Sequence, residues 1–179
     1  MGKLLYGATM SLDGFIAGPN DDMSWLTDFF GPDPVADELV ANVGSCLIGA
    51  RTFWGNDPNA GTDQEGPFGG AWKGPQFVLT HRPHPEPVED VTFVGDLATA
   101  IAESRAAAGD GYACVIGADV ARQCLEAGEL DEVLVFIAPI LLGDGVRLFS
   151  HPGGADYRLE RPRVHETPHA TSLWYRVKK

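Results

Sequence analysis

The sequence predicts an α/β fold, in which about four helices cover a mostly parallel sheet of about eight strands. Three observations lead to this prediction. Short apolar runs alternate with helical patterns along most of the chain. The run at 133–138 is rich in β-branched and aromatic residues, which is typical of a central strand. Two extended segments, 158–166 and 170–177, follow each other closely, so we expect an antiparallel pair at the end of the sheet.

The length and composition favour a single domain that spans residues 1–179. Apolar residues make up 44% of the 179 residues, which is enough for a sizeable core. The 25 acidic and 13 basic side chains give a formal net charge of −12. This balance disfavours nucleic acid and anionic membranes as partners, but it allows a local basic pocket for one phosphorylated small molecule.

The sequence also carries expectations about location, thiols and metals. No apolar run approaches the roughly 18 residues of a membrane span, and the N-terminus does not read as a secretory signal, so we expect a cytoplasmic protein. Cys46, Cys114 and Cys124 stand among apolar or helix-forming neighbours, and we expect reduced, buried thiols. The histidines lack metal-ligand spacing, so we expect no metal site.

The N-terminal elements follow from local signals. An apolar run at 3–9 predicts a strand, and the turn formers at 10–23 predict a long loop. Asp33 is a suitable N-cap for a helix that has Pro34 at its first position, and Gly44 fits the C-terminal end of that helix.

The same signals predict the middle of the chain. Apolar runs bounded by Gly and Pro indicate strands, a capping Asp indicates a helix start, and Gly indicates a helix end. In chain order, we expect a strand at 46–49, a short helix at 51–54, a loop at 55–75, strands at 76–80 and 91–94, a helix from a cap at Asp96 to 108, a strand at 113–116 and a helix from Gly117 to Gly128.

Three strand ends carry residues that could hold phosphate groups. At the first, Gly117 would let backbone approach a ligand, and the N–H groups of Ala118, Asp119 and Val120 would open the next helix. The alternative is an ordinary tight entry into a helix that Asp119 caps.

The second strand end is Gly49, followed by Arg51 and Thr52 at a helix start, which together could cradle a phosphate. The alternative is a capped helix with a solvated arginine.

An apolar turn at 139–145, which contains two glycines, could lie against a flat ring or could simply end a central strand.

The third strand end is Thr80, His81 and Arg82, which could bind a further phosphate such as the 2′-phosphate of NADP. The alternative is a strand that runs into a loop stiffened by the prolines at 83–85. Phosphate-binding groups after three separate strands suit a dinucleotide, whose phosphates are well separated.

Several segments resemble, in their order and spacing, the three-layer dihydrofolate-reductase-like fold, and especially the reductase domain of the bifunctional riboflavin-biosynthesis deaminase-reductase and its stand-alone relatives. The similarity spans most of the chain, and its most specific segment is 138–145. The segments are Ser11-Leu12-Asp13-Gly14-Phe15-Ile16-Ala17, Asp22-Met23-Ser24-Trp25-Leu26, Gly49-Ala50-Arg51-Thr52-Phe53, Val78-Leu79-Thr80-His81-Arg82, Val115-Ile116-Gly117-Ala118, Leu130-Asp131-Glu132 and Ala138-Pro139-Ile140-Leu141-Leu142-Gly143-Asp144-Gly145.

The resemblance implies an NADPH-dependent reductase that passes hydride to a small heterocyclic or sugar-linked acceptor, and it implies a homodimer. By this resemblance, the cofactor-binding residues would be Ala8, Asp13, Gly14, Ile16, Gly49, Arg51, Thr52, Thr80, His81, Arg82, Gly117, Ala118, Asp119 and Val120. The residues near the substrate would be Met10, Trp25, Leu142 and Gly143.

Two positions bear on whether the chain turns over a substrate. Dihydrofolate reductases carry a carboxylate shortly after a Trp, and Asp28, three residues after Trp25, is the matching candidate acid; the alternative is that Asp28 caps a helix. The family usually has two consecutive glycines where this chain has Gly117 and Ala118. A nucleotide-binding or ligand-sensing protein without turnover is therefore the second hypothesis, and a hydrolase that uses a carboxylate and a histidine is the third.

Overall fold

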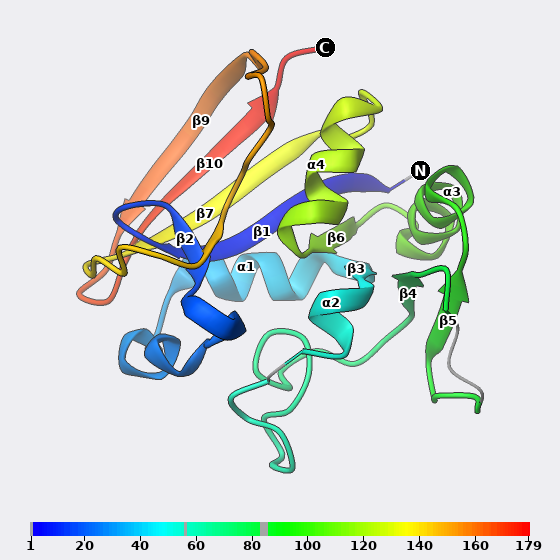
Figure 1. Cartoon of the computed structure of the whole chain (residues 1–179), viewed down its shortest axis with the longest axis horizontal. Helices are drawn as coiled ribbons and strands as arrows, with labels where there is room; N and C mark the ends of the chain where they lie inside the picture. The colour runs from blue at the N-terminus through cyan, green and yellow to red at the C-terminus, as the bar shows by residue number, and fades with distance from the viewer. Residues whose placement is uncertain (1, 56, 83–85) are drawn as a thin grey trace.

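The computed structural model describes residues 2–55, 57–82 and 86–179 and confirms the predicted α/β fold (Figure 1). All eight predicted strands lie in one sheet, in the order β5-β4-β3-β6-β1-β7-β10-β9. They are β1 (Lys3–Ser11), β3 (Val43–Gly49), β4 (Gln76–Leu79), β5 (Val91–Val94), β6 (Tyr112–Ile116), β7 (Glu132–Ala138), β9 (Leu159–Glu166) and β10 (Thr171–Val177).

The sheet is parallel from β5 to β7 and antiparallel at its C-terminal end. β1 lies between β6 and β7 and is parallel to both. β10 runs antiparallel to β7, and β9 runs antiparallel to β10. The carboxyl ends of six parallel strands therefore share one edge of the sheet, and ligands of open α/β sheets bind at that edge.

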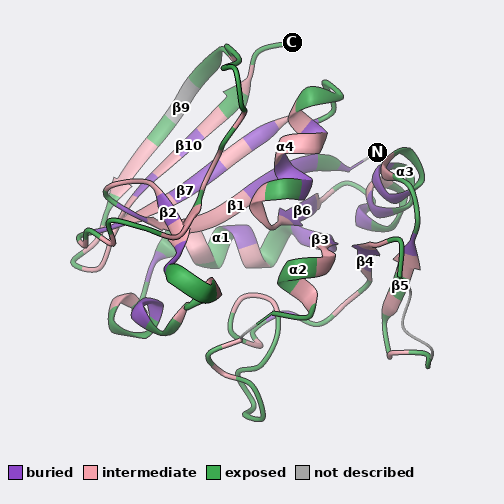
Figure 2. Ribbon diagram, in the orientation of Figure 1, coloured by how far each residue is buried: buried purple, intermediate pink, exposed green. Residues whose placement is uncertain are grey.

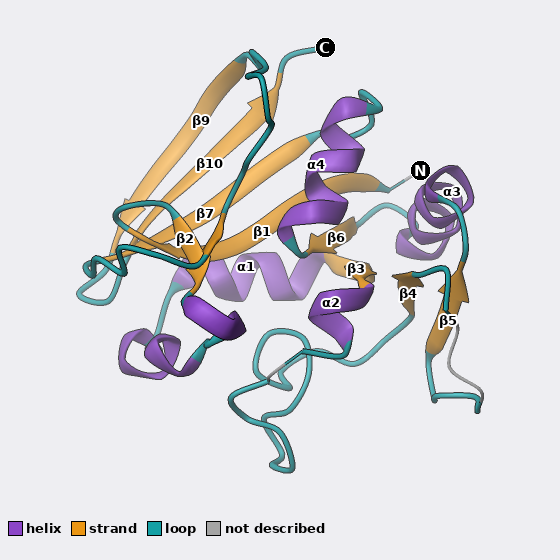
Figure 3. Ribbon diagram, in the orientation of Figure 1, coloured by secondary structure: helices purple, strands orange, loops and turns teal. Residues whose placement is uncertain are grey.

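Four α-helices and two 3₁₀ helices accompany the sheet in the described residues (Figure 3). They are η1 (Pro19–Asp21), η2 (Ser24–Phe29), α1 (Pro34–Asn42), α2 (Ala50–Phe53), α3 (Leu97–Ala108) and α4 (Ala118–Glu126). None of the helices among these residues is long and apolar enough to cross a membrane.

The core has two halves because successive side chains of a strand point to opposite faces. On one face, Leu4 and Tyr6 of β1 pack with buried residues of α3 and α4. On the other face, Leu5 packs with Val35 and Leu39 of α1. The helices thus form layers on both faces, and the inner strands between them are the most buried part of the molecule (Figure 2).

The predicted helix starts are confirmed, and one predicted helix end is wrong. The Asp33 carboxylate accepts hydrogen bonds from the first turn of α1, and the Asp96 carboxylate accepts one from the Thr99 N–H. Gly44 does not close α1, because Val43 already begins β3. The strand needs a glycine at this position, since a Cβ on Gly44 would lie 2.4 Å from the Ala108 carbonyl oxygen.

The predicted loop at 10–23 is only partly a loop. β1 continues to Ser11, and β2 (Phe15–Ala17) pairs with the short strand β8 (Val146–Arg147) far along the chain.

The three cysteines are free and buried, as predicted. Burial raises the pKa of the Cys114 thiol and that of the Cys124 thiol to about 12, so these thiols are poor nucleophiles at neutral pH.

Candidate functional site

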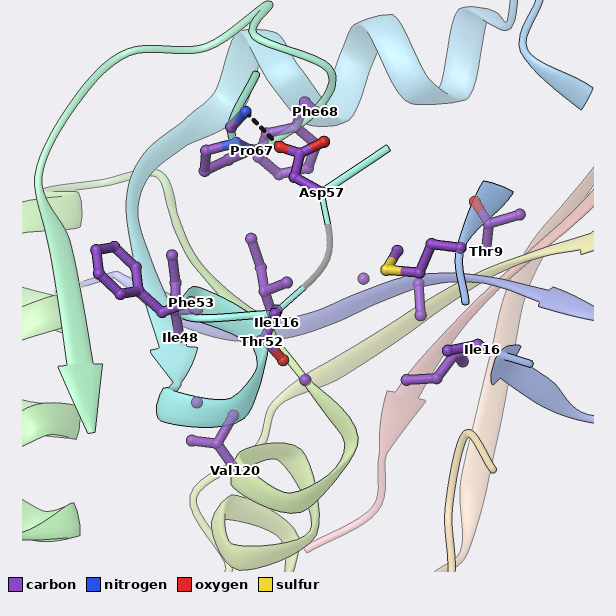
Figure 4. Close-up of a pocket in the computed structure, with 18 of the residues that line it drawn as sticks. Thr9, Ile16, Ile48, Thr52, Phe53, Asp57, Pro67, Phe68, Ile116 and Val120 are labelled. Carbon is purple, nitrogen blue, oxygen red and sulfur yellow. Dashed lines mark hydrogen bonds between the residues drawn. The ribbon is translucent and has the colours of Figure 1, made fainter. Parts of the chain in front are cut away.

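Two of the three predicted strand-end junctions, those after β3 and β6, lie against each other. A Cβ on Gly117 would lie 2.5 Å from the Thr52 Oγ1, and a Cβ on Gly49 would lie 3.6 Å from Val120 Cγ1. Figure 4 shows Thr52 and Val120 close to Ile116, the last residue of β6. The end of β3 and the end of β6 therefore form one surface with two exposed backbone stretches.

Gly117 has the backbone geometry that this surface requires. Its φ of 113° and ψ of 134° lie in a region that residues with side chains rarely adopt. It is the N-cap of α4 and provides no side-chain cap, so the first N–H groups of the helix have no partner from the cap. Ala118 already lies inside the helix and has no positive φ, so an alanine is compatible with the backbone there.

Asp119 does not cap α4, contrary to the alternative interpretation of this junction. Its carboxylate instead accepts hydrogen bonds from Arg122 Nη2 at 2.7 Å and from Gln123 Nε2 at 2.8 Å. The acid is thus tied to the side of the helix by i,i+3 and i,i+4 contacts.

A large cleft of about 2130 Å³ opens over the carboxyl edge of the sheet. Its lining includes twelve of the fourteen predicted cofactor-binding residues, namely Ala8, Ile16, Gly49, Arg51, Thr52, Thr80, His81, Arg82, Gly117, Ala118, Asp119 and Val120. We call residues 48–52, 80–82 and 116–120 the strand-end wall of the cleft.

The opposite side of the cleft is built from η2, α1 and the loop after α2, where the sequence analysis placed no cofactor-binding residue. We call residues 23–40 and 57–71 the loop wall. In Figure 4, Asp57 and Phe68 face the cleft from this wall. The Asp57 carboxylate accepts hydrogen bonds from the Asn59 and Gly66 N–H groups, both at 2.8 Å. The contact with Asn59 is typical of an Asx-turn. The sequence signal that could have identified Asp57 is therefore an Asp among turn-forming residues.

Asp13 and Gly14 do not line the cleft, although the sequence analysis placed them over the cofactor. The Asp13 carboxylate accepts hydrogen bonds from Ser11 Oγ at 2.6 Å and from the Leu142 and Gly143 N–H groups. These hydrogen bonds lower the pKa of Asp13 to about 2, and the one from Ser11 has the largest effect. Asp13 therefore fastens the turn after β1 to the loop after β7.

The predicted substrate residues Met10, Trp25, Leu142 and Gly143 also lie outside the cleft lining. Trp25 is buried in a small separate cluster against which Leu142 packs. Asp28 lies in η2, is exposed, does not line the cleft and does not cap a helix. The geometry therefore does not support Asp28 as the proton donor.

Arg51 reaches the mouth of the cleft but is already paired with a carboxylate. Its Nε and Nη2 donate to the two Asp21 oxygens at 2.9 and 2.6 Å. Both groups keep contact with solvent, since the Arg51 side chain is 74% exposed. A guanidinium group that donates two hydrogen bonds to a carboxylate in this way can also bind a phosphate.

The third junction lies beside the first two and forms a small turn. The Thr80 Oγ1 accepts a hydrogen bond from the Arg82 N–H at 3.0 Å, and the His81 and Arg82 side chains are exposed. The alternative interpretation of this junction involved the prolines at 83–85, which lie outside the described residues.

Metal binding and thiol chemistry receive no support within the described ranges. No group of three or more His, Cys, Asp or Glu side chains there could hold a metal ion.

Comparisons with known proteins point to one family. The sequence profile of the RibD C-terminal domain family matches residues 3–170. The uncharacterized protein YwjB of Bacillus subtilis is 25% identical over 149 residues, which is 82% of each chain.

Solved structures show the same fold. A putative riboflavin biosynthesis protein from Shewanella sp. PV-4 is 25% identical, with a TM-score of 0.76 over 100% of both chains. A diaminohydroxyphosphoribosylaminopyrimidine deaminase/5-amino-6-(5-phosphoribosylamino)uracil reductase from Thermotoga maritima is 18% identical, with a TM-score of 0.64. The latter match covers 99% of this chain but 57% of the Thermotoga chain.

Proposed function

Because the chain belongs to the RibD C-terminal domain family, we propose that it is an NADPH-dependent reductase that transfers hydride to a small heterocyclic or sugar-linked acceptor. The observation that carries this proposal is the contact between Gly117 and Thr52, where the ends of β6 and β3 form a surface of free backbone and hydroxyl groups. The Thermotoga relative, whose name includes a reductase activity, supports the same reaction class.

The residues of the strand-end wall fit a dinucleotide. A side chain at Gly117 would fill the space beside Thr52, so the backbone can approach a pyrophosphate there. The uncapped N-terminus of α4 offers N–H groups to the same anion. Arg51 would hold the pyrophosphate as well, and His81 with Arg82 would hold the 2′-phosphate of NADPH.

When bound, the nicotinamide would supply a hydride ion to the acceptor. The protein would orient the two ligands and exclude water, for which few reactive side chains are needed. Ile16 and Ala8 line the cleft near the end of β1 and would form an apolar surface for the ring. The acceptor also needs a proton, and Asp28, which does not line the cleft, is not placed to deliver it from the lining.

The test is calorimetric titration of the protein with NADPH and, separately, with NADH. We expect NADPH to bind at least about tenfold more tightly, because a charge-assisted contact to the 2′-phosphate is worth roughly 1.5 kcal/mol or more. The variant Arg82→Gln should remove this preference, while Arg51→Gln should weaken both cofactors. Arg158→Gln, which changes an exposed arginine outside the cleft lining, serves as the matched control. Absence of binding by either cofactor would overturn the proposal.

One observation favours a second function, a nucleotide-binding or ligand-sensing protein without turnover. The acid nominated from the sequence, Asp28, does not reach the cleft. NADPH binding without oxidation across folate, pterin, pyrimidine and quinone acceptors would favour this alternative, and oxidation at 340 nm with any of them would exclude it.

A further inference from the structure

The loop wall differs from the strand-end wall in the kind of side chain that it presents to the cleft. Phe68 extends from the loop 57–71 toward the cleft, opposite Ile116 and Thr52 (Figure 4). The apolar side chains that line this part of the cleft are Met23, Leu26, Phe29, Phe30, Leu39, Val40 and Phe68, and Phe136 of β7 lines the cleft with them. Such a surface suits a flat or apolar ring.

The charges of the loop wall all have one sign. Residues 23–40 and 57–71 contain no Lys, Arg or His. They contain seven carboxylates, and the five that line the cleft are Asp33, Asp37, Asp57, Asp63 and Glu65.

Three of these carboxylates are fixed in place by the backbone. Asp33 caps α1, Asp57 binds the Asn59 and Gly66 N–H groups, and Glu65 accepts a hydrogen bond from the Gly61 N–H at 2.7 Å. These acids shape the wall itself, so their negative charge cannot turn away from a ligand without loosening the loop.

Most of the cations that line the cleft are engaged by other groups or belong to the strand-end wall, as His81 and Arg82 do. Arg51 pairs with Asp21, Arg122 pairs with Asp119 and Glu126, and Arg147 lies 4.6 Å from the centre of the Phe15 ring. Lys73 is exposed and lies between the end of the loop wall and the start of β4, so it is a cation beside the loop wall that no carboxylate of that wall binds in the described part of the chain. The ring of His169 packs against Gly31.

We infer that the acceptor is an unphosphorylated ring compound, uncharged or cationic, that packs against the loop wall. This inference rests on the proposed function, because it concerns the second ligand of the same cleft. A phosphate is normally recognised by cations or by free N–H groups, and the loop wall presents carboxylates instead, which repel a dianion. The name of the Thermotoga relative includes a phosphoribosyl substrate, so this chain is expected to differ from it in its acceptor.

The test uses a matched pair of probes, 1-naphthol and 1-naphthyl phosphate, which differ only in the phosphate group. Their binding is measured by calorimetry with the protein saturated with NADP⁺, so that the phosphate sites of the strand-end wall are filled. We expect 1-naphthol to bind at least about tenfold more tightly than 1-naphthyl phosphate. Equal binding, tighter binding of the phosphate, or binding of neither probe overturns the inference.

A charge-reversal variant sharpens the result. Asp63 lines the cleft, and its side chain has no hydrogen-bond partner among the described residues. Asp63→Lys should strengthen the binding of 1-naphthyl phosphate about threefold or more and leave 1-naphthol unchanged. Asp110→Lys makes the same change of net charge at an exposed position outside the cleft and should have no effect. An equal response of the two variants overturns the inference.

The two proposals fail in different ways. If NADP⁺ and NADPH do not bind, the proposed function fails, and the probe pair is then measured on the protein alone. A preference for 1-naphthol there would assign the loop wall to an unphosphorylated ring ligand that is not the acceptor of a reductase. If the cofactors bind and 1-naphthyl phosphate is preferred, the inference fails and the proposed function stands.

Discussion

The two edges of the sheet use charge in opposite ways. At the amino edge, the buried Glu132 carboxylate accepts hydrogen bonds from Lys3 Nζ, the Tyr112 hydroxyl and Trp174 Nε1. At the carboxyl edge, Arg51 is exposed and has only a solvent-accessible pair. The comparison indicates that one edge holds the fold together while the other is left open for a ligand.

The amino edge has a second fully paired acid. Asp131 accepts hydrogen bonds from the Leu4 N–H and from Lys179, and it forms an ion pair with Arg105 at 2.8 Å. These contacts tie the start of β1 to the segment before β7 and to the C-terminus. Substitutions at this edge should therefore change stability and leave ligand binding intact, and those at the other edge should do the reverse.

The largest effect on stability is expected for Glu132→Ala. The change leaves the buried Trp174 Nε1 and the Tyr112 hydroxyl without an acceptor, which costs about 3 kcal/mol. For a chain of this size, thermal unfolding should occur roughly 6–12 °C lower, with NADPH affinity unchanged. Glu126→Ala, which removes an exposed ion pair, is the control and should change the unfolding temperature little. Equal effects of the two variants, or a loss of NADPH binding in Glu132→Ala, would contradict the division of the edges.

The next effect is expected at the carboxyl edge, for Gly117→Ala. The new Cβ would collide with Thr52 and adopt an unfavourable φ, so we expect NADPH affinity to fall by about tenfold or more, together with a loss of about 1–3 kcal/mol of stability. Gly128→Ala, at the other end of α4, also has a positive φ but opens into free space. We expect the Gly128→Ala variant to lose stability and to keep its affinity for NADPH. If both variants bind NADPH like the wild type, the surface of Gly117 and Thr52 is not a cofactor site.

A smaller effect in the opposite direction is expected for Asp21→Asn. If Arg51 binds the cofactor's phosphate, Asp21 competes with that phosphate for the same guanidinium. Removing one exposed ion pair should then tighten NADPH binding about two- to fivefold, measured by calorimetry. Asp22→Asn is the control, because Asp22 binds the Ser24 N–H and does not contact Arg51. Weaker binding by Asp21→Asn would show that Asp21 positions Arg51 instead.

Most of the fold could be predicted from the sequence because its signals are local. Asp33 and Asp96 mark helix starts, and the apolar runs together with the two extended C-terminal segments mark all eight strands of the main sheet. The prediction failed where distant segments decide the structure. Gly44 joins a strand because β3 pairs with β6, and the loop at 10–23 contains β2 because that segment pairs with β8.

The same limit applies to the site. The strand-end wall could be predicted because parallel strands bring their carboxyl ends to one edge. The positions of Trp25, Asp28 and Leu142 could not, because the direction of a side chain in η2 or in the loop after β7 depends on tertiary packing. The loop wall escaped prediction for the same reason, since the stretch 55–75 has no periodicity to indicate which side chains face inward.

The smallest expected effect tests a charge that joins the turn after β1 to the loop after β7. The pKa of Asp13 is lowered to about 2 by its hydrogen bonds with Ser11, Leu142 and Gly143. A carboxyl group whose pKa is lower in the folded than in the unfolded chain stabilises the fold above its unfolded pKa of about 4, and that contribution is lost as the pH falls toward 2. The unfolding temperature of Asp13→Asn should therefore lie below that of the wild type at pH 5, and the gap should close between pH 4 and pH 2. Asp110→Asn, at an exposed acid away from the cleft, should show no such closing gap. A gap that stays constant with pH would mean that Asp13 contributes by shape alone and that its hydrogen bonds do not favour the charged carboxylate.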